Sequence, residues 1–548
     1  RYDLTGATAA EAKAIGGRLL ANPVIQRITH EPYFPSAFPV GTPHDHQKRT
    51  IAVRGLSDEQ LTRLSRDAHL FLSLEEMRAI QEHYRAAQRD PADIELETLA
   101  QTWSEHCVHK TLKSTVLYRR GEGSKPRSHE GQEEGREATK RRSDGGTERS
   151  DEGTKRRSDG GEGRDGEVAD PIRWEGRPGH EVHADGSVTI HNLLKSTVAA
   201  ATKELIAEGV DWTLSVFVDN SGVIAFDEQH AVCVKVETHN HPSAIEPYGG
   251  AATGVGGCIR DVIATGLGAR PIANTDVFCV ANPDQWREQG EATKAGDGRA
   301  TLPPGTLHPK RILQQVVAGV RDYGNRMGIP TVSGAVAFDN RYVGNPLVFC
   351  GCIGVMPRER VKGQVRRGDL IVAIGGRTGR DGIHGATFSS AELEHTAADE
   401  FAHAVQIGNA ITEKQALDAI LRAAEYRDDR GNAAPLFSGL TDCGAGGFSS
   451  AIGELGKSTG AVVNLENAPL KYAGLSYTEI WISEAQERFV LAVPRKNLEA
   501  LRAICDEEGV ELAVLGTFTN PPGSTPENPD LQLMFKGEEV GRLSMHFM

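Results

Sequence analysis

From residue 188 onward, strand-like and helix-like segments alternate, and this alternation constrains the fold more than any other feature of the chain. Strand-like runs are WTLSVFVDN, AVCVKVE, PIANTDVFCVAN and LVFCGCIGVM, and the helical pattern PKRILQQVVAGVRDYGNRMG lies among them. A second unit begins near residue 360 with GDLIVAIGG, followed by the helical ITEKQALDAILRAAEY and the strand-like ERFVLAVP. Such alternation predicts α/β or α+β layers. Because 548 residues exceed one ordinary core, we expect two to four domains.

The part before residue 119 shows a different pattern. Residues 56–118 predict a helical region, because apolar residues recur at three- and four-residue spacing in LSDEQLTRLSRDAHLFLSLEEMRAIQEHY. Ser57 suits a helix start, and Ser73 with Glu76 fits a capping box. Residues 33–55, rich in proline and polar residues, indicate a linker, and residues 1–32 combine a helix-like pattern, AAEAKAIGGRLLANP, with the strand-like VIQRITHE.

Residues 119–187 form a charged insertion. Between residues 119 and 167 there is one alanine and no other aliphatic or aromatic residue, and the octapeptide TKRRSDGG occurs twice. Such a segment buries too little apolar surface to offset its ordering entropy, so we expect it to be disordered. It is either a basic arm for nucleic acid or a neutral, solvated loop. The loop is favoured because positive and negative charges balance locally.

Composition excludes several classes of protein. The net charge of −14 argues against a general nucleic-acid or membrane-surface binder. No apolar run approaches the length of a membrane span, and no signal peptide opens the chain. The eight cysteines form no CxxC pair, which argues against a zinc knuckle or redox motif and favours a reducing, cytoplasmic compartment.

The stretch KVETHNHPSAIEPYGGAATGVGGCIRD, residues 235–261, concentrates chemically active side chains. Carboxylates such as Glu237, Asp261 and the more distant Asp442 suit magnesium, which prefers oxygen ligands. Lys235 and Arg260 suit phosphate oxygens. The glycines at 249, 250, 254, 256 and 257 predict a backbone nest for a phosphate.

Four further islands accompany this stretch: TWSEHCVHKT at 102–111, VQIGNA at 405–410, TDCGAGGFSS at 441–450 and SEAQERF at 483–489. His106 and His239 are side chains that can move protons near neutral pH. Taken singly, each feature has a plainer interpretation, since a lone histidine is more often a core residue and an Asp before glycines is more often a turn. Their joint occurrence favours a site for a metal and a phosphate.

Other motifs fail. GELGKST at 453–459 lacks the first glycine of a phosphate loop, because that position is Ala451, and its context predicts a plain helix. No GxGxxG follows a strand, so a dinucleotide site has no support. His239-Asn240-His241 spells the letters of a nuclease motif, but the acidic chain and the lack of neighbouring ligand histidines argue against one.

The islands resemble a known family. SEHC, the 235–261 stretch, DCGAGG and SEAQER closely resemble the synthetase component of phosphoribosylformylglycinamidine synthase, and the resemblance spans about 56–118 and 188–548. It implies an aminoimidazole ribonucleotide synthetase-like N-terminal ATP-binding domain at 188–357, a C-terminal domain at 358–540, and a helical linker domain at 56–118 before them.

The resemblance implies a ligase of purine biosynthesis that forms a C–N bond. Formylglycinamide ribonucleotide, ATP and glutamine-derived ammonia would give the amidine, ADP, phosphate and glutamate. ATP would phosphorylate the amide oxygen, and ammonia would then displace phosphate, which leaves far more readily than the amide oxygen. Magnesium would neutralise charge on the transferring group.

Site roles follow from the resemblance position by position. It implies catalytic roles for His106 and His239, and magnesium ligation by Glu237, Asp261 and Asp442. It implies ATP contacts for Lys235 and His109, the latter standing where the family often has tyrosine. The implied substrate contacts are Thr238, His239, Asn240, His241, Arg260, Gln406, Glu484, Ala485 and Gln486. Gly408-Asn409-Ala410 replaces a common GDP, and Ala485 replaces a serine.

The resemblance also implies partners. The family's synthetase repeats its two-domain unit and builds the active site from both copies. We therefore expect a missing second half, whose N-terminal domain would pair with that of this chain through their sheets. Residues 1–32, mainly LLANPVIQRITHE, resemble the tail of the small PurS-like subunit. No motif for a glutaminase nucleophile surrounds Cys107, so ammonia would come from a PurQ-like glutaminase. The alternatives are a catalytically incomplete half that acts as a nucleotide-binding scaffold, or another ATP-dependent enzyme of the superfamily, such as a thiamine-phosphate or selenophosphate kinase.

Overall fold

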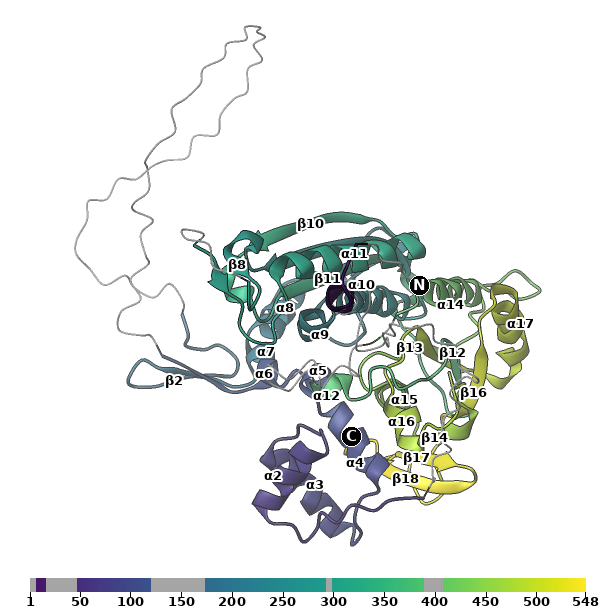
Figure 1. The fold of residues 1–548 in the computed structure, drawn as a ribbon. Helices are drawn as coiled ribbons and strands as arrows, with labels where there is room; N and C mark the ends of the chain where they lie inside the picture. Colours follow the sequence, from purple (N-terminus) through teal and green to yellow (C-terminus); the bar gives the residue numbers. More distant parts are fainter. Residues whose placement is uncertain (1–5, 16–46, 120–172, 292–297, 389–405, 407) are drawn as a thin grey trace, which may run out of the picture. The chain divides into compact units, whose positions relative to one another are not determined.

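The computed structural model describes residues 6–15, 47–119, 173–291, 298–388, 406 and 408–548 (Figure 1). The chain divides into two compact units, Arg1–Thr111 with Glu204–Met548, and Leu112–Lys203. Most of the tail expected at 1–32, much of the linker expected at 33–55 and the core of the charged insertion lie outside the described residues. In the tail, the expected helix is present as α1 (Ala9–Ile15).

The unit Leu112–Lys203 corrects one boundary. β1 (Val116–Tyr118), β2 (His180–Val182) and β3 (Val188–Ile190) form an antiparallel sheet of order β1-β3-β2. The insertion was expected to stay disordered to residue 187, and the α/β domain to begin at 188. Both expectations are wrong, because an Asp-Gly turn at 185–186 joins β2 to β3 as a hairpin. α7 (Leu193–Ser196) and α8 (Val198–Ala207) follow.

The helical region begins where the sequence predicts. Its helices are α2 (Asp58–Asp67), α3 (Leu74–Ala86), α4 (Asp93–Thr102), α5 (Glu105–Val108) and α6 (Lys110–Lys113). Ser57 and Ser73 are N-caps of α2 and α3, and both capping boxes are formed, which confirms the predicted starts. Leu61, Met77 and Ile80 are fully buried in a core that also includes Leu543 of β18.

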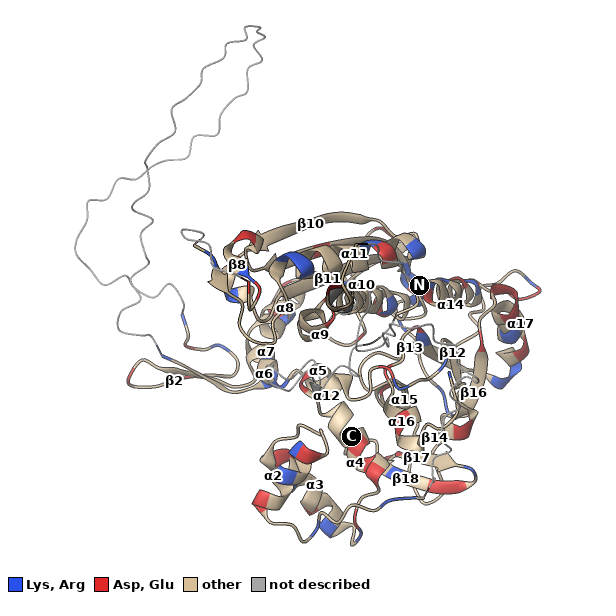
Figure 2. Cartoon of the chain, viewed as in Figure 1, with Lys and Arg blue, Asp and Glu red and all other residues tan. Residues whose placement is uncertain are grey.

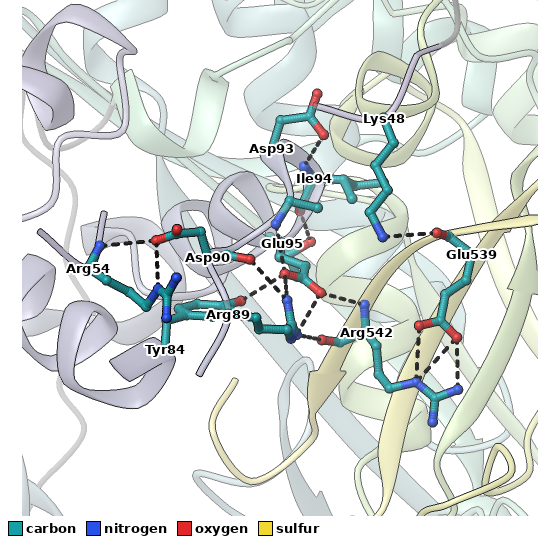
Figure 3. A network of polar contacts seen from close by, with 12 residues as sticks. Lys48, Arg54, Tyr84, Arg89, Asp90, Asp93, Ile94, Glu95, Glu539 and Arg542 are labelled. Atoms are coloured by element: carbon teal, nitrogen blue, oxygen red, sulfur yellow. Dashed lines mark hydrogen bonds and ion pairs between the residues drawn. The ribbon is translucent and has the colours of Figure 1, made fainter. Parts of the chain in front are cut away.

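A buried carboxylate fixes α4 on β18 (Glu538–Ser544), as Figure 3 shows. Glu95 is 2 % exposed and accepts two hydrogen bonds from the guanidinium of Arg89, at 2.6 and 2.9 Å. The Tyr84 hydroxyl, at 3.1 Å, and the backbone N–H of Arg542, at 2.7 Å, donate to it as well. Because α5 follows α4 directly, this contact also determines where the SEHC island lies.

The first sheet has six strands in the order β10-β7-β11-β6-β5-β4, antiparallel except for the β10–β7 pair. Its elements are β4 (Thr213–Ser215), β5 (Gly222–Ala225), β6 (His230–Thr238), α9 (Asn240–Ile245), α10 (Pro247–Ile263), β7 (Arg270–Val280), β8 (Trp286–Arg287), β9 (Ala300–Thr301), α11 (Pro309–Met327), β10 (Thr331–Phe338) and β11 (Leu347–Pro357). The strand predicted over 212–220 is shorter than expected, because Phe217 adopts a φ of 62°.

One face of this sheet is covered and the other is open. Val255 and Ile259 of α10 and Val316 of α11 join one buried core with the strands. On the opposite face, Val234 and Val236 are 42 % and 48 % exposed. All eight residues of β10, the edge strand, are exposed, and the strand carries no charged residue (Figure 2).

The second sheet has seven strands in the order β13-β15-β12-β16-β14-β17-β18. Its elements, with β18 above, are β12 (Leu370–Gly375), α12 (Gly385–Phe388), α14 (Ala410–Ala424), β13 (Gly439–Asp442), α15 (Phe448–Gly456), β14 (Ala461–Asn464), α16 (Tyr477–Ile482), β15 (Arg488–Val493), α17 (Leu498–Glu508), β16 (Leu512–Thr517) and β17 (Asp530–Phe535). The α/β (α+β) prediction is confirmed, and the first four residues of GELGKST form the end of helix α15, so the phosphate-loop motif is absent as expected. No helix in the described ranges is long and apolar enough to cross a membrane.

Candidate active site

Strand β6 supplies the first site residues. Its side chains alternate between faces, so Lys235 and Glu237 lie on the same side as fully buried Cys233, which is the side that α10 covers. Val236 points to the open face. The strand ends at Thr238, and His239 is the N-cap of α9.

The glycines that follow do not form a phosphate nest, and that prediction is wrong. Residues 249, 250, 254, 256 and 257 all belong to α10, and none has a positive φ. From Gly250 onward these amides bond to carbonyls four residues earlier, so they are not offered to a ligand. The Gly249 amide lies in the first turn of the helix and bonds to the Glu246 carboxyl. The glycines serve close packing instead. A Cβ on Gly250 would lie 2.5 Å from the Ser243 nitrogen, and one on Gly256 would lie 2.6 Å from the Tyr323 ring.

His239 has a defined tautomer. Its Nδ1 lies 2.6 Å from the carbonyl oxygen of Gly250, and a carbonyl oxygen can only accept a hydrogen bond. Nδ1 therefore carries the proton, and in the neutral ring Nε2 is the basic nitrogen. The backbone N–H of His239 donates to Val348 at 2.9 Å, and Ser243 Oγ donates to the His239 carbonyl at 2.6 Å.

Asn240 and His241 continue this turn. The Asn240 side-chain oxygen accepts from the Val348 N–H at 2.9 Å, which ties the start of α9 to β11. Burial lowers the pKa of His241, so its imidazole is held toward the neutral form.

Lys235 lies between two carboxylates. Its Nζ is 2.8 Å from Glu237 Oε1 and 3.2 Å from Asp261 Oδ2. Burial alone would lower the pKa of Lys235, but Asp261 and Glu237 raise it overall, so the ammonium stays charged. Burial, together with Asp442 and Glu237, raises the pKa of Asp261 well above its usual value. Extra positive charge would therefore stabilise this cluster.

Arg260 lies deep in the wall formed by α10 and is 2 % exposed. Its Nη1 donates to Glu413 Oε2 at 3.0 Å, and its Nε is 3.8 Å from Asp442 Oδ2. Among the described residues, Nε has no hydrogen-bond partner.

The SEAQER island places one carboxylate at the site. Glu484 accepts from the N–H groups of Ala386 at 2.7 Å and Gly446 at 2.9 Å, and from Gln406 Nε2 at 2.6 Å. Ala485 and Gln486, 0 % and 1 % exposed, lie behind it. The Gln486 amide donates to Gln406 Oε1.

These segments enclose a cavity of about 470 Å³. Among the residues proposed from the sequence, its walls include His109, Lys235, Glu237, Thr238, His239, Asn240, His241, Arg260, Asp261, Gln406, Asp442 and Glu484. Ala485 and Gln486 are not part of the wall, so a direct substrate contact by either is not supported; the chain turns inward after Glu484. His106 belongs to α5, and its side chain lies outside the described residues.

Charge in the cavity is unbalanced. Six carboxylates line it against Lys235 and Arg260: Asp219, Glu237, Asp261, Asp442, Glu454 and Glu484. A bare phosphate would be repelled by this excess, so an anionic ligand needs an accompanying cation. The oxygen donors of Glu237, Asp261 and Asp442 fit magnesium chemically. Within the described residues no three such side chains stand ready-arranged around one metal position, and Lys235 lies between two of these carboxylates.

Sequence reasoning missed several wall residues. Asp219 and Asn220 follow the short strand β4, and Thr253 lies on α10 among the glycines. Glu454 lies on α15, one helical turn after Ser450 of the TDCGAGGFSS island. A search for polar residues at i+4 from each island would have found Glu454.

Three family models match the chain. Residues 61–110 match the formylglycinamide ribonucleotide amidotransferase linker domain. Residues 218–356 and 366–527 match the N-terminal and C-terminal domains of AIR synthase related proteins.

Curated relatives carry one description. The chain is 31 % identical over 504 residues to phosphoribosylformylglycinamidine synthase subunit PurL of Thermoplasma volcanium, covering 91 % of this chain and 51 % of the relative. The chain is 32 % identical over 475 residues to the same subunit of Thermoplasma acidophilum, covering 86 % of this chain and 48 % of the relative. The chain therefore spans about half the length of these relatives.

Among solved structures, Thermotoga maritima PurL complexed with FGAR superimposes with a TM-score of 0.54 at 26 % identity. The match covers 86 % of this chain and 55 % of that one.

Proposed function

Because the chain belongs to the PurL family of phosphoribosylformylglycinamidine synthase subunits, we propose that it is the front half of an ATP-dependent ligase of purine biosynthesis. The reaction would convert formylglycinamide ribonucleotide and glutamine-derived ammonia to formylglycinamidine ribonucleotide. One observation carries the proposal: residues from the linker, N-terminal and C-terminal domains, chosen from the sequence, meet in a single cavity.

The chemistry of each cavity residue suits it to a different role. Lys235 supplies a fixed ammonium for phosphate oxygens of ATP, and His109 lies in the same wall. Arg260, Thr238 and Gln406 would orient the ribonucleotide. Magnesium held by Glu237, Asp261 and Asp442 would neutralise charge on the transferring phosphoryl group.

His239 would accept the proton. Its Nδ1 is held by the Gly250 carbonyl, so Nε2 can take a proton from ammonia as the new C–N bond forms. Phosphate then leaves from the activated amide carbon with the former amide oxygen. For His106 we propose a second active-site role, on its position in α5.

Ammonia would come from elsewhere. Cys107 is the cysteine that lines the cavity, and burial raises the pKa of its thiol to about 11, so little thiolate forms at neutral pH. A separate PurQ-like glutaminase, with a PurS-like subunit or domain, would supply it. All eight cysteines are unpaired, which supports the cytoplasmic location that we propose.

The open sheet face supports a downstream partner. Val234 and Val236 are exposed on it, and β10 offers an uncharged edge. Exposed, unprotected strands of this kind pair readily with other chains. We propose that the occupant is the second synthetase half, since the relatives are about twice as long as this chain.

The test is ADP release with ribonucleotide, MgATP and ammonium chloride. It compares this chain with a longer protein that continues into the downstream half found in its relatives. The longer protein should release ADP only when ribonucleotide is present. His239→Ala should lower that rate roughly 100-fold or more, as expected for loss of a general base.

His230→Ala is the matched control. It lies on the same strand, is exposed and pairs with Asp227, outside the cavity wall. It should leave the rate unchanged. If neither protein releases ribonucleotide-dependent ADP, the ligase proposal is wrong and the scaffold alternative gains support. Turnover by the 548-residue chain alone would mean that it pairs with itself.

A further inference from the structure

A polar cluster lies behind Arg260, outside the cavity wall. It consists of Tyr323 on α11, Glu413 on α14 and Glu487 just before β15, which are 2 %, 0 % and 4 % exposed. Two carboxylates buried this completely need a specific reason, because burying charge costs free energy unless it is paired.

The contacts link the cluster to Arg260. Glu413 Oε2 accepts from Arg260 Nη1 at 3.0 Å and from the Tyr323 hydroxyl at 2.5 Å. The same hydroxyl lies 3.0 Å from Glu487 Oε1, which also accepts from the N–H of Asn409 at 2.7 Å. Asn409 is the N-cap of α14, so Glu487 holds the start of the helix that carries Glu413.

Packing leaves the cluster little room to move. A Cβ on Gly256 of α10 would lie 2.6 Å from the Tyr323 ring, and a Cβ on Gly408 would lie 2.9 Å from its Cε2. The ring is therefore clamped between α10 and the residue before the N-cap of α14. This clamp fixes the hydroxyl between the two carboxylates.

The hydroxyl proton cannot satisfy both carboxylates. Tyr323 can donate only one hydrogen bond, so Glu413 and Glu487 fit best when they share one further proton, which lets one of them donate to the tyrosine oxygen. The groups facing Glu413 are Arg260 from α10, Tyr323 from α11, Glu487 and the thiol of Cys352 on β11. Burial raises the pKa of Glu413 to about 7, although Arg260 opposes this.

We propose that Glu413 is a positioning residue for Arg260 and is itself held by Tyr323 and Glu487. The inference rests on the proposed function, in which Arg260 contacts the ribonucleotide. Glu413 satisfies Nη1 from behind and draws the guanidinium away from Asp442, which lies 3.8 Å from Nε. Without Glu413, the guanidinium would turn toward the carboxylates of the cavity.

The cluster also joins Arg260 to other proposed substrate contacts. Gln406 lies three residues before Asn409, and Glu484 lies three residues before Glu487. The side chains of Gln406 and Glu484 bond directly to each other, and the Asn409 N–H bonds to Glu487. Substrate contacts from the N-terminal and C-terminal domains are thus tied together through one buried junction.

The first test separates the two substrates in the longer protein. Glu413→Ala should raise KM for the ribonucleotide about tenfold, which is the size expected for losing a hydrogen bond to a charged group. KM for ATP should stay within about twofold of the wild-type value. Glu413→Gln keeps an acceptor for Nη1, so its KM for the ribonucleotide should lie close to the wild-type value. A purely structural role would lower kcat through loss of folded enzyme and leave both KM values unchanged.

Asp418→Ala is the control on the same helix, because Asp418 is 36 % exposed and pairs only with Lys414 among the ion pairs of the described residues. Its KM values should match the wild type. If Glu413→Ala does not fold, Tyr323→Phe decides, since it removes only the hydroxyl. Unchanged ribonucleotide KM in the folded variants would overturn the proposal.

The second test needs no substrate and uses the 548-residue chain. Glu413 has a folded pKa of about 7 against an ordinary 4.5, so its protonation stabilises the fold below pH 4.5 and this contribution is lost as pH rises through 7. The thermal midpoint should therefore fall less between pH 5 and 8 in Glu413→Gln than in the wild type or Asp418→Ala. An identical fall would contradict the proton shared between Glu413 and Glu487.

The two tests separate the two proposals. Absence of ribonucleotide-dependent ADP from the wild-type longer protein would refute the ligase and leave the pH test to judge the cluster. Ribonucleotide-dependent turnover with unchanged KM in Glu413→Ala would refute the positioning role alone.

Discussion

Two adjacent glycines of α10 have opposite surroundings. A Cβ on Gly256 would lie 2.6 Å from the Tyr323 ring, whereas one on Gly257 would meet nothing closer than Arg260 Nη2 at 3.8 Å and Glu237 Oε2 at 4.0 Å. Gly256 is required for packing, and Gly257 leaves open space next to the site. The two positions make a matched pair for experiment.

Gly256→Ala should destabilise the fold by about 1–3 kcal/mol, because the added methyl overpacks a rigid core. Gly257→Ala should leave stability unchanged or raise it by up to about 1 kcal/mol, because alanine is the better helix former. Urea unfolding of both variants measures this. Equal stability of the two variants would contradict the packing seen around Tyr323.

At the residue scale, sequence indicated most of the cavity wall. His239, Lys235, Glu237 and Arg260 sit in one distinctive stretch, and alternation along a strand followed by a helix brings them together. Glu413 could not be found this way, because it lies in an ordinary amphipathic helix and gains its role only by packing against α10. The glycines between 249 and 257 led to a wrong prediction of a phosphate nest. Glycine suits a nest through its backbone freedom, whereas in α10 it allows close packing.

At the element scale, α4 depends on one carboxylate. Glu95→Ala removes the acceptor for Arg89, Tyr84 and the Arg542 N–H together (Figure 3). Glu95 is buried but the Arg89 side chain is 44 % exposed, so the cost comes mainly from the buried donors that lose their acceptor. It should be about 1–3 kcal/mol in the free energy of unfolding. Chemical denaturation followed by tryptophan fluorescence measures it, since Trp103 lies at the end of α4.

Asp67→Ala is the corresponding surface control. Asp67 is 62 % exposed and pairs with Arg66, so its loss should cost less than about 1 kcal/mol. A loss that small for Glu95→Ala would mean that α4 is held by its apolar contacts and that the carboxylate adds little.

Element prediction succeeded where a pattern was strong. Ser57 marked the start of α2, a capping box marked the start of α3, and strand-like runs marked β6 and β15. β10 was missed because TVSGAVAF mixes small and apolar residues without alternation, and it becomes a strand by pairing with β7. The hairpin of β2 and β3 was missed although its Asp-Gly turn was visible in the sequence.

At the scale of the whole molecule, the open sheet face should bind the second half. Val236→Glu places a charge on that face and should weaken binding between this chain and the separately produced downstream half by about tenfold or more, because a charge would be buried without a partner. Sedimentation measures the complex. Val317→Glu is the control, since Val317 is 45 % exposed on α11. Equal binding by both variants would contradict the proposed surface.

The most direct test of the account follows one oxygen atom. Ribonucleotide labelled with ¹⁸O at the amide is turned over by the longer protein with MgATP and ammonium chloride in ordinary water, and the released phosphate is analysed by mass spectrometry. If the amide oxygen is phosphorylated and then displaced at this cavity, each phosphate carries one ¹⁸O, and His239→Ala releases almost none. Unlabelled phosphate would mean that water attacks ATP and would contradict the proposed function.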